Sequence, residues 1–436
     1  MNVSRPFRLF PILFALAQLP SSAMAQIDDY EQPPINYSKS QPHDAISRLE
    51  KRLASGGAQF AGDDKNIARA LLRELQIPEA SQIVVFSKTS FQRKRIEPSH
   101  PRALYFSDSC YVGWVPGGLM EITTIDPLLG PVFYSYDPHA ALEKNAPRFA
   151  RDSDCLTCHA TSGVNNTPGV FARSVFPNNE GEPLLRQGSE MVDYRTPFDH
   201  RWGGWYVTGQ HGNALHRGNV FASEHGDELV ADFHKGANVT NLSCFFETAN
   251  YLRADSDIVA LMVFEHQLAM QNAIVQANFR CRRMMDYQRK LQHDLKEPIT
   301  DDPTYDSVKS VFKSSANDVL DALLFKDEAS LPDGIKGSAD FQRAFRANAK
   351  TVKGAGSLKD LSLHGHLFVN RCSYLIYSES FLALPKLLKE RIYDGLDKAL
   401  RSKTPDERYS YLDTDERARI VKILRATHPD LAVTWR

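Results

Sequence analysis

The feature that most constrains this chain is the five-residue run Cys155-Leu156-Thr157-Cys158-His159. It has the form C-x-x-C-H, in which two thiols three positions apart can form thioether bonds with the two vinyl groups of one porphyrin. The histidine that follows the second cysteine directly is then placed to give its imidazole to the iron. The run therefore predicts one covalent haem c per chain, attached through Cys155 and Cys158, with His159 as an iron ligand.

Two other uses of a C-x-x-C pair fit the rest of the chain less well. A zinc site needs a second ligand pair, and the remaining cysteines are scattered. A thioredoxin-like redox pair follows a buried strand, whereas residues 148–154 are polar and charged. The histidine after the second cysteine favours haem over both. The four other thiols leave open whether disulfides form: Cys110, Cys244, Cys281 and Cys372.

The first residues indicate export. Arg5 and Arg8 give a basic start, residues 9–19 are an apolar run of signal-peptide length, and residues 23–25 form a small-x-small cleavage pattern. We therefore expect residues 1–25 to be a signal peptide and the mature protein to be periplasmic. That compartment is oxidising. The apolar run is shorter than the roughly 20 residues of a membrane helix, and no membrane span is expected.

The charge balance argues against two classes of partner. The whole chain has 52 Lys and Arg and 53 Asp and Glu, so the mature chain, without Arg5 and Arg8, carries 50 − 53 = −3. A near-neutral protein of this kind has no electrostatic footprint for nucleic acid or for an anionic membrane. The expected partner is a redox protein of unknown identity, and the oligomeric state stays open.

The hydrophobic pattern predicts an α+β fold in three parts. Small N-terminal helices at 43–55 and 64–75 come first, followed by an antiparallel sheet-rich middle that bears the haem run and by a helical C-terminal half. We divide the mature chain into an α+β region at 26–254 and a helical region at 255–436 packed on it. The strands are expected at 83–86, 103–106, 111–115, 121–125, 132–136, 169–176 and 203–208, and the later helices at 256–295, 304–326, 386–400 and 414–425.

The C-x-x-C-H run resembles the attachment run of c-type cytochromes. Residues 201–209 (RWGGWYVTG) and 372–378 (CSYLIYS) look similar to large bacterial exported proteins with one such run. The resemblance implies a covalently bound haem in a protein much larger than a small cytochrome. It implies no particular reaction.

The ligand opposite His159 decides between an electron carrier and an enzyme. We assign it to His211, which lies beside Gly212 after an aromatic strand. Met191, His216 and His266 are the alternatives, and His266 shares one helix face with Met262 and Met270. His364 and His366 are expected on a surface strand.

The leading hypothesis is an exported mono-haem c-type protein that transfers single electrons. One alternative is a periplasmic haem enzyme of peroxidase, oxidase or oxygenase type with an open distal site. The other is a haem subunit of a larger assembly. The redox potential and the substrate do not follow from the sequence.

Overall fold

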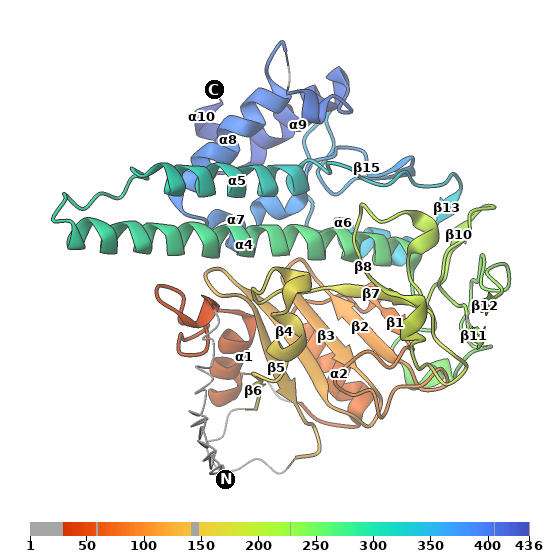
Figure 1. Ribbon diagram of the computed structural model, residues 1–436. Helices are drawn as coiled ribbons and strands as arrows, with labels where there is room; N and C mark the ends of the chain where they lie inside the picture. Colours follow the sequence, from red (N-terminus) through yellow and green to blue (C-terminus); the bar gives the residue numbers. More distant parts are fainter. Residues whose placement is uncertain (1–28, 58–59, 141–147, 227, 405, 436) are drawn as a thin grey trace, which may run out of the picture.

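The computed structural model describes residues 29–57, 60–140, 148–226, 228–404 and 406–435. The signal peptide expected at residues 1–25 lies outside the described residues. Figure 1 shows two N-terminal helices, a central sheet and a helical C-terminal half that lies across one end of the sheet. The predicted α+β class is therefore confirmed, with its three parts in the expected order.

The N-terminal helices are α1 (Ala45–Ala54) and α2 (Asp64–Glu74). Helix α1 begins where Asp44 accepts the backbone N–H of Ser47, a capping interaction that satisfies one of the free amides of the first turn. The second carboxylate oxygen of the buried Asp44 accepts from Thr124 Oγ1 at 2.5 Å and from Tyr134 Oη at 2.7 Å. This one carboxylate thus both starts the helix and attaches it to the sheet.

The central sheet has seven strands in the order β6-β5-β4-β3-β2-β1-β9, and every neighbouring pair is antiparallel. Strands β1 to β6 form a meander, in which each strand pairs with the next one along the chain. Turn residues such as Pro116-Gly117-Gly118 separate the short β-rich runs and allow the chain to reverse between them. Strand β9 then joins the open edge of β1. The bounds are β1 Ile83–Val85, β2 Arg102–Phe106, β3 Cys110–Trp114, β4 Met120–Asp126, β5 Gly130–Tyr136, β6 Ala150–Arg151 and β9 Trp205–Tyr206.

The two faces of this sheet are covered differently. One face, which includes Tyr105, Val112 and Ile122, packs on α1 and α2. The other face, which includes Phe106 and Tyr111, packs on the long helix α4 (Ile258–Asp294). The larger core cluster continues from this face through the helical half to the last helices. The regions 26–254 and 255–436 therefore share one hydrophobic core.

Helix α4 begins at Asp257, whose side chain accepts the N–H of Ala260, as the expected helix at 256–295 requires. It pairs with α5 (Asp306–Leu323) to form a hairpin whose far end projects from the body in Figure 1. The other helices of this half are α6 Ala339–Arg346, α7 Glu379–Leu382, α8 Lys386–Leu400, α9 Thr414–Thr427 and α10 Leu431–Thr434.

Helix α4 also differs from one expectation. Among the described residues it is the one helix long and apolar enough to cross a membrane, although no such stretch was expected. In the fold, 83% of its most apolar 18-residue window is buried inside the protein. Its apolar character is thus accounted for by packing between the sheet and the C-terminal helices.

Four small antiparallel pairs complete the fold. Strand β7 pairs with β8, β10 with β13, β11 with β12, and β14 with β15. His364 and His366 end β14 and begin β15, so the one strand expected through both is two paired strands that turn at Gly365, where φ is 67°. The bounds are β7 Ala172–Val175, β8 Ser189–Val192, β10 Gln210–His211, β11 Ala222–His225, β12 Glu228–Ala231, β13 Ile335–Lys336, β14 Leu361–His364 and β15 His366–Phe368.

We predict that Asp44→Ala lowers the free energy of unfolding by about 3 kcal/mol, because it removes a helix cap and leaves two buried hydroxyl groups without their acceptor. Asp63→Ala removes only the cap of α2, so it should cost about 1 kcal/mol. Urea unfolding of the two variants measures both values. Equal losses would show that the contacts of Asp44 with the sheet contribute nothing.

Candidate haem-attachment site

The C-x-x-C-H run lies on one turn of helix, α3 (Leu156–His159), directly after the edge strand β6. Strand β6 is fixed by its pairing with β5 and by Arg151, whose guanidinium donates to the carbonyls of Tyr37 at 2.7 Å and of Ser40 at 2.9 Å. The turn that follows is closed by Asp152, which accepts the N–H of Asp154. The run is therefore held at the edge of the sheet by the strand before it.

His159 is oriented by three contacts. Its ring lies between those of Phe133 and Phe171, with both centroid distances 4.7 Å. Its Nδ1 lies 2.9 Å from the carbonyl oxygen of Gly169, which can only accept, so Nδ1 carries the proton. Burial lowers the pKa of His159 to about 4, and the hydrogen bond to Gly169 opposes this only in part. The ring is thus neutral at neutral pH, and its free lone pair is on Nε2.

The Nε2 atom of His159 makes no hydrogen bond within the described residues and is not among their buried, unpartnered atoms. It is therefore open to a ligand. A histidine that binds a metal usually donates its other ring N–H to a carbonyl or carboxylate, which fixes the tautomer and the ring orientation. His159 has this arrangement, with Gly169 as the acceptor.

The two cysteines lie one helical turn apart. The backbone N–H groups of Cys158 and His159 both point to the carbonyl of Cys155. Cys158 is exposed and Cys155 is partly buried, and both are free thiols. Burial, together with the nearby carboxylates of Asp152 and Glu121, raises the pKa of Cys155 to about 12. The other four cysteines also form no disulfide: Cys110, Cys244, Cys281 and Cys372. Of these four, Cys244 is exposed and the other three are buried.

The loop after α3 folds back onto α4. The N–H of Gly169 donates to the carbonyl of His159 at 2.8 Å. The next residue, Val170, exchanges two hydrogen bonds with the side chain of Asn272 on α4. A side chain at Gly169 would lie within 3.0 Å of Val164 and Asn272 atoms, so glycine is required for this approach. The acceptor of His159 is thereby fixed to the longest helix of the protein.

Cationic side chains flank the histidine. Arg102 on β2 lies across Gly113 and forms an ion pair with Glu121 on β4, both less than a fifth exposed. The buried Nε of Arg102 has no hydrogen-bond acceptor. Arg173 on β7 lies over the ring of Phe171 at 5.3 Å. Both arginines act with burial to lower the pKa of His159. Two thiols, a free imidazole nitrogen and nearby guanidinium groups fit a haem, which has two vinyl groups, an iron and two carboxylates.

Met191 is the sixth-ligand candidate that contacts the loop after the run. Its side chain, 38% exposed, rests on Gly163, four residues after His159, where a Cβ would lie 2.8 Å from its sulfur. It also lines a cavity of about 400 Å³ that begins at Gly163 and runs between β8 and the helices α4 and α5. Met191 therefore places a thioether beside the attachment run.

His211, the ligand expected from the sequence, is differently placed. It is buried on β10, its Nδ1 donates to the carbonyl of Ala214 at 2.8 Å, and its Nε2 accepts the N–H of Asn238 at 2.9 Å. No hydrogen bond or ring contact joins it to residues 155–159 in the described chain. To bind iron, His211 would have to give up its bond with Asn238. Its neighbour His216 is also buried, and its Nδ1 accepts from Gly218.

His266 lies inside the core of the helical half. Its ring stacks on Phe325 with a centroid distance of 4.0 Å, and its Nε2 lies 2.8 Å from Ser373 Oγ. Met262 and Met270 are buried in the same core. Burial lowers the pKa of His266 to about 3. The Met/His stripe on α4 therefore lies in packed core, and none of the three residues lines the cavity beside Gly163.

The sequence singles out the two cysteines and His159 as candidates, but not the residues that orient His159 in the fold. Phe133, Phe171 and Gly169 come from a strand and a loop that meet only in the fold. Arg102 is more than 50 residues before the run. Of these residues, only Gly169 could have been noticed in the sequence, because it is a glycine at the end of a polar loop. Comparison with protein-family models, curated proteins and solved structures found no match to this chain.

The burial of His266 predicts a pH effect on stability. The unfolded chain binds a proton at the ordinary histidine pKa near 6.5, whereas folding lowers the pKa of His266 to about 3. The unfolded state therefore binds more protons below pH 6.5, and this residue should reduce the free energy of unfolding by about 2 kcal/mol between pH 7 and pH 5. His266→Gln should remove that part of the pH dependence in urea unfolding.

Phe325→Leu is the matched control for this prediction. It disturbs the ring that stacks on His266 but removes no titratable group. It should lower stability at every pH and keep the pH dependence of the native chain. An unchanged pH dependence in His266→Gln would contradict the prediction.

Proposed function

We propose that this chain is an exported mono-haem c-type protein that transfers single electrons. The haem is bonded to Cys155 and Cys158, and His159 binds its iron. The observation that supports this most directly is the state of His159, whose Nδ1 is engaged by Gly169 while Nε2 has no partner among the described residues and is accessible. A metal-binding histidine commonly has this arrangement, with one ring nitrogen held by a carbonyl and the other left for the metal.

The bound haem supplies one-electron redox chemistry, and the chain sets its environment. Phe133 and Phe171 keep the imidazole of His159 in one orientation. Arg173 places positive charge near it, which favours the reduced iron, whereas the charge of Arg102 is balanced by Glu121. The same guanidinium groups are suitable partners for the carboxylates of the haem.

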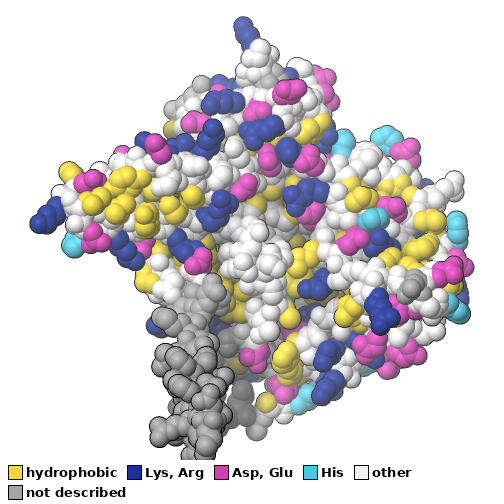
Figure 2. Space-filling view, viewed as in Figure 1, with side chains coloured by type: hydrophobic (Ala, Val, Ile, Leu, Met, Phe, Trp, Pro, Cys, Tyr) yellow, Lys and Arg dark blue, Asp and Glu magenta, His cyan; other side chains and the backbone are white. Residues whose placement is uncertain are grey.

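The surface supports a partner that is not selected by strong charge. Figure 2 shows Lys and Arg side chains interspersed with Asp and Glu over the visible face, with no large region of one sign. This agrees with the near-neutral net charge. We propose that the electron partner is a periplasmic protein that docks through short-range contacts near Cys158, the exposed end of the run.

A second function is favoured by one observation. The cavity of about 400 Å³ beside Gly163 is large enough for a small substrate, as a haem enzyme with an open distal site would need. Its charged lining is largely paired internally, since Arg195 pairs with Asp193 and Arg280 pairs with Asp318. We therefore place the carrier first and the enzyme second.

Absorption spectra recorded during a redox titration, with and without carbon monoxide, separate these two functions. The mature protein, produced together with haem-attachment machinery, should show reversible one-electron oxidation and reduction in its absorption spectrum. If the chain is a carrier, carbon monoxide should leave the reduced spectrum unchanged. An immediate shift with carbon monoxide would contradict the carrier and support the enzyme. The double variant Cys155→Ser with Cys158→Ser is the control and should show no redox-active absorption.

For the sixth ligand we propose Met191 in place of His211, because its thioether lies against Gly163 in the loop after the run, whereas both ring nitrogens of His211 are engaged. Met191→Leu keeps the apolar volume and removes the sulfur, so it should convert a low-spin spectrum to a high-spin one. His211→Gln should leave the spectrum low-spin. The reverse pattern would return the assignment to His211, and no effect of either variant would exclude both.

A further inference from the structure

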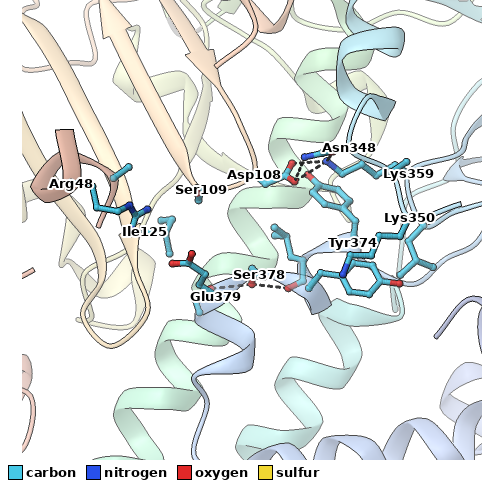
Figure 3. Close-up of a pocket in the computed structure, with 16 residues that line it drawn as sticks. Arg48, Asp108, Ser109, Ile125, Asn348, Lys350, Lys359, Tyr374, Ser378 and Glu379 are labelled. Carbon is cyan, nitrogen blue, oxygen red and sulfur yellow. Dashed lines mark hydrogen bonds and ion pairs between the residues drawn. The ribbon is translucent and has the colours of Figure 1, made fainter. Parts of the chain in front are cut away.

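A second cavity lies away from the attachment run, where the sheet meets the C-terminal half (Figure 3). It has a volume of about 290 Å³ and is formed by four parts of the chain that are far apart in sequence. We call it the Lys350 cavity. Its charged lining residues are Arg48 on α1, Asp108 in the β2–β3 turn, Lys350 and Lys359 after α6, and Glu379 on α7.

One wall of the Lys350 cavity is formed by Lys359, Asp108 and Asn348, which together carry no net charge and which we call the clasp. The ammonium group of Lys359, only 7% exposed, donates to both carboxylate oxygens of Asp108 at 2.8 Å and to Asn348 Oδ1 at 2.7 Å. The rings of Phe345 and Tyr374 lie 4.7 Å from it. All its donors are thus engaged, and its charge is balanced by Asp108. The clasp gives shape to the cavity but leaves no charge for a ligand.

Two other cations of the cavity are not balanced. Lys350 places its ammonium group 4.2 Å from the centre of the Tyr377 ring and forms no ion pair within the described residues. The guanidinium of Arg48 makes one long hydrogen bond, of 3.4 Å, to the carbonyl of His43, and likewise has no carboxylate partner there. Figure 3 shows the two residues on opposite sides of the cavity. An anionic group at each end would therefore meet a free cation.

The space between these cations has mixed walls: Ile125, Leu358 and Tyr374 give it an apolar and aromatic part, and serine side chains add polar groups. It suits a short hydrocarbon chain. Glu379 is exposed at the cavity and also has no ion pair among the described residues, so its carboxylate opposes an anion. Because Lys359 and Asp108 neutralise each other, the charges that remain in the cavity are those of Lys350, Arg48 and Glu379, which sum to one positive charge.

We propose that the Lys350 cavity binds a short organic dicarboxylate, with one carboxylate at Lys350 and the other at Arg48. The hydrocarbon part lies against Ile125, Leu358 and Tyr374. Both cations are accessible to solvent, so the affinity is modest. This site is independent of the haem proposal, since none of its residues belongs to the attachment run.

Calorimetric titration of the mature protein with succinate and with butyrate tests the site. The two probes have the same number of carbons, but only succinate has a second carboxylate for Arg48. Succinate should bind about tenfold more tightly, which corresponds to one added charge-assisted hydrogen bond of about 1.4 kcal/mol. Equal affinities, or no heat of binding with succinate, would overturn the proposal.

Variants assign the ends of the ligand. Lys350→Met should weaken both probes about tenfold, whereas Arg48→Met should reduce succinate to the affinity of butyrate and leave butyrate unchanged. Glu379→Gln should strengthen both, because it removes the opposing charge. Lys353→Met and Arg73→Met make the same charge changes at exposed positions outside the cavity and should change neither affinity. Equal weakening in these controls would show non-specific attraction and overturn the site.

Discussion

The site depends on one hydrogen bond, from His159 Nδ1 to the carbonyl of Gly169. It closes the loop after the C-x-x-C-H run and decides which nitrogen of the ring keeps its lone pair. Because Val170, the next residue, is bound to Asn272, the bond also ties the run to helix α4. The rings of Phe133 and Phe171 then restrict the rotation of the imidazole. The histidine that we propose as the haem ligand is thereby oriented by the chain itself.

This arrangement gives a physical reason for the size of the chain. The strand that carries Phe133 is held in place by the sheet, and the sheet is covered by α1 and α2 on one face and by α4 on the other. Helix α4 in turn is buried by the C-terminal helices. The three layers are thus the support for a small site at their edge. They also form the Lys350 cavity, which needs the sheet and the helical half together.

The fold was largely readable from the sequence because its signals are local. Pro116-Gly117-Gly118 and Asp126-Pro127 separate the strands of the meander, and Asp257 begins the long helix at the expected position. The proposed attachment residues stand out for the same reason, since the run is contiguous.

The sequence could not predict the contacts between residues that are far apart along the chain. No local pattern indicates that the ring of Phe133 meets that of His159, or that Asn238 engages the second nitrogen of His211. The helical spacing of Met262, His266 and Met270 was correct, but it describes a buried core face and does not open onto the cavity beside Gly163. Nor does any local pattern indicate the exposure of Met191, which appears only in the fold.

The most direct test of the central claim is to locate the haem on the chain. Trypsin cleaves after Arg151 and Arg173, so both cysteines and His159 fall in one peptide, residues 152–173. Mass spectrometry of the digested mature protein, produced with haem-attachment machinery, should find this peptide heavier by one haem bonded at Cys155 and Cys158. Recovery of the peptide with two free thiols from that protein, or haem on any other peptide, would contradict the account.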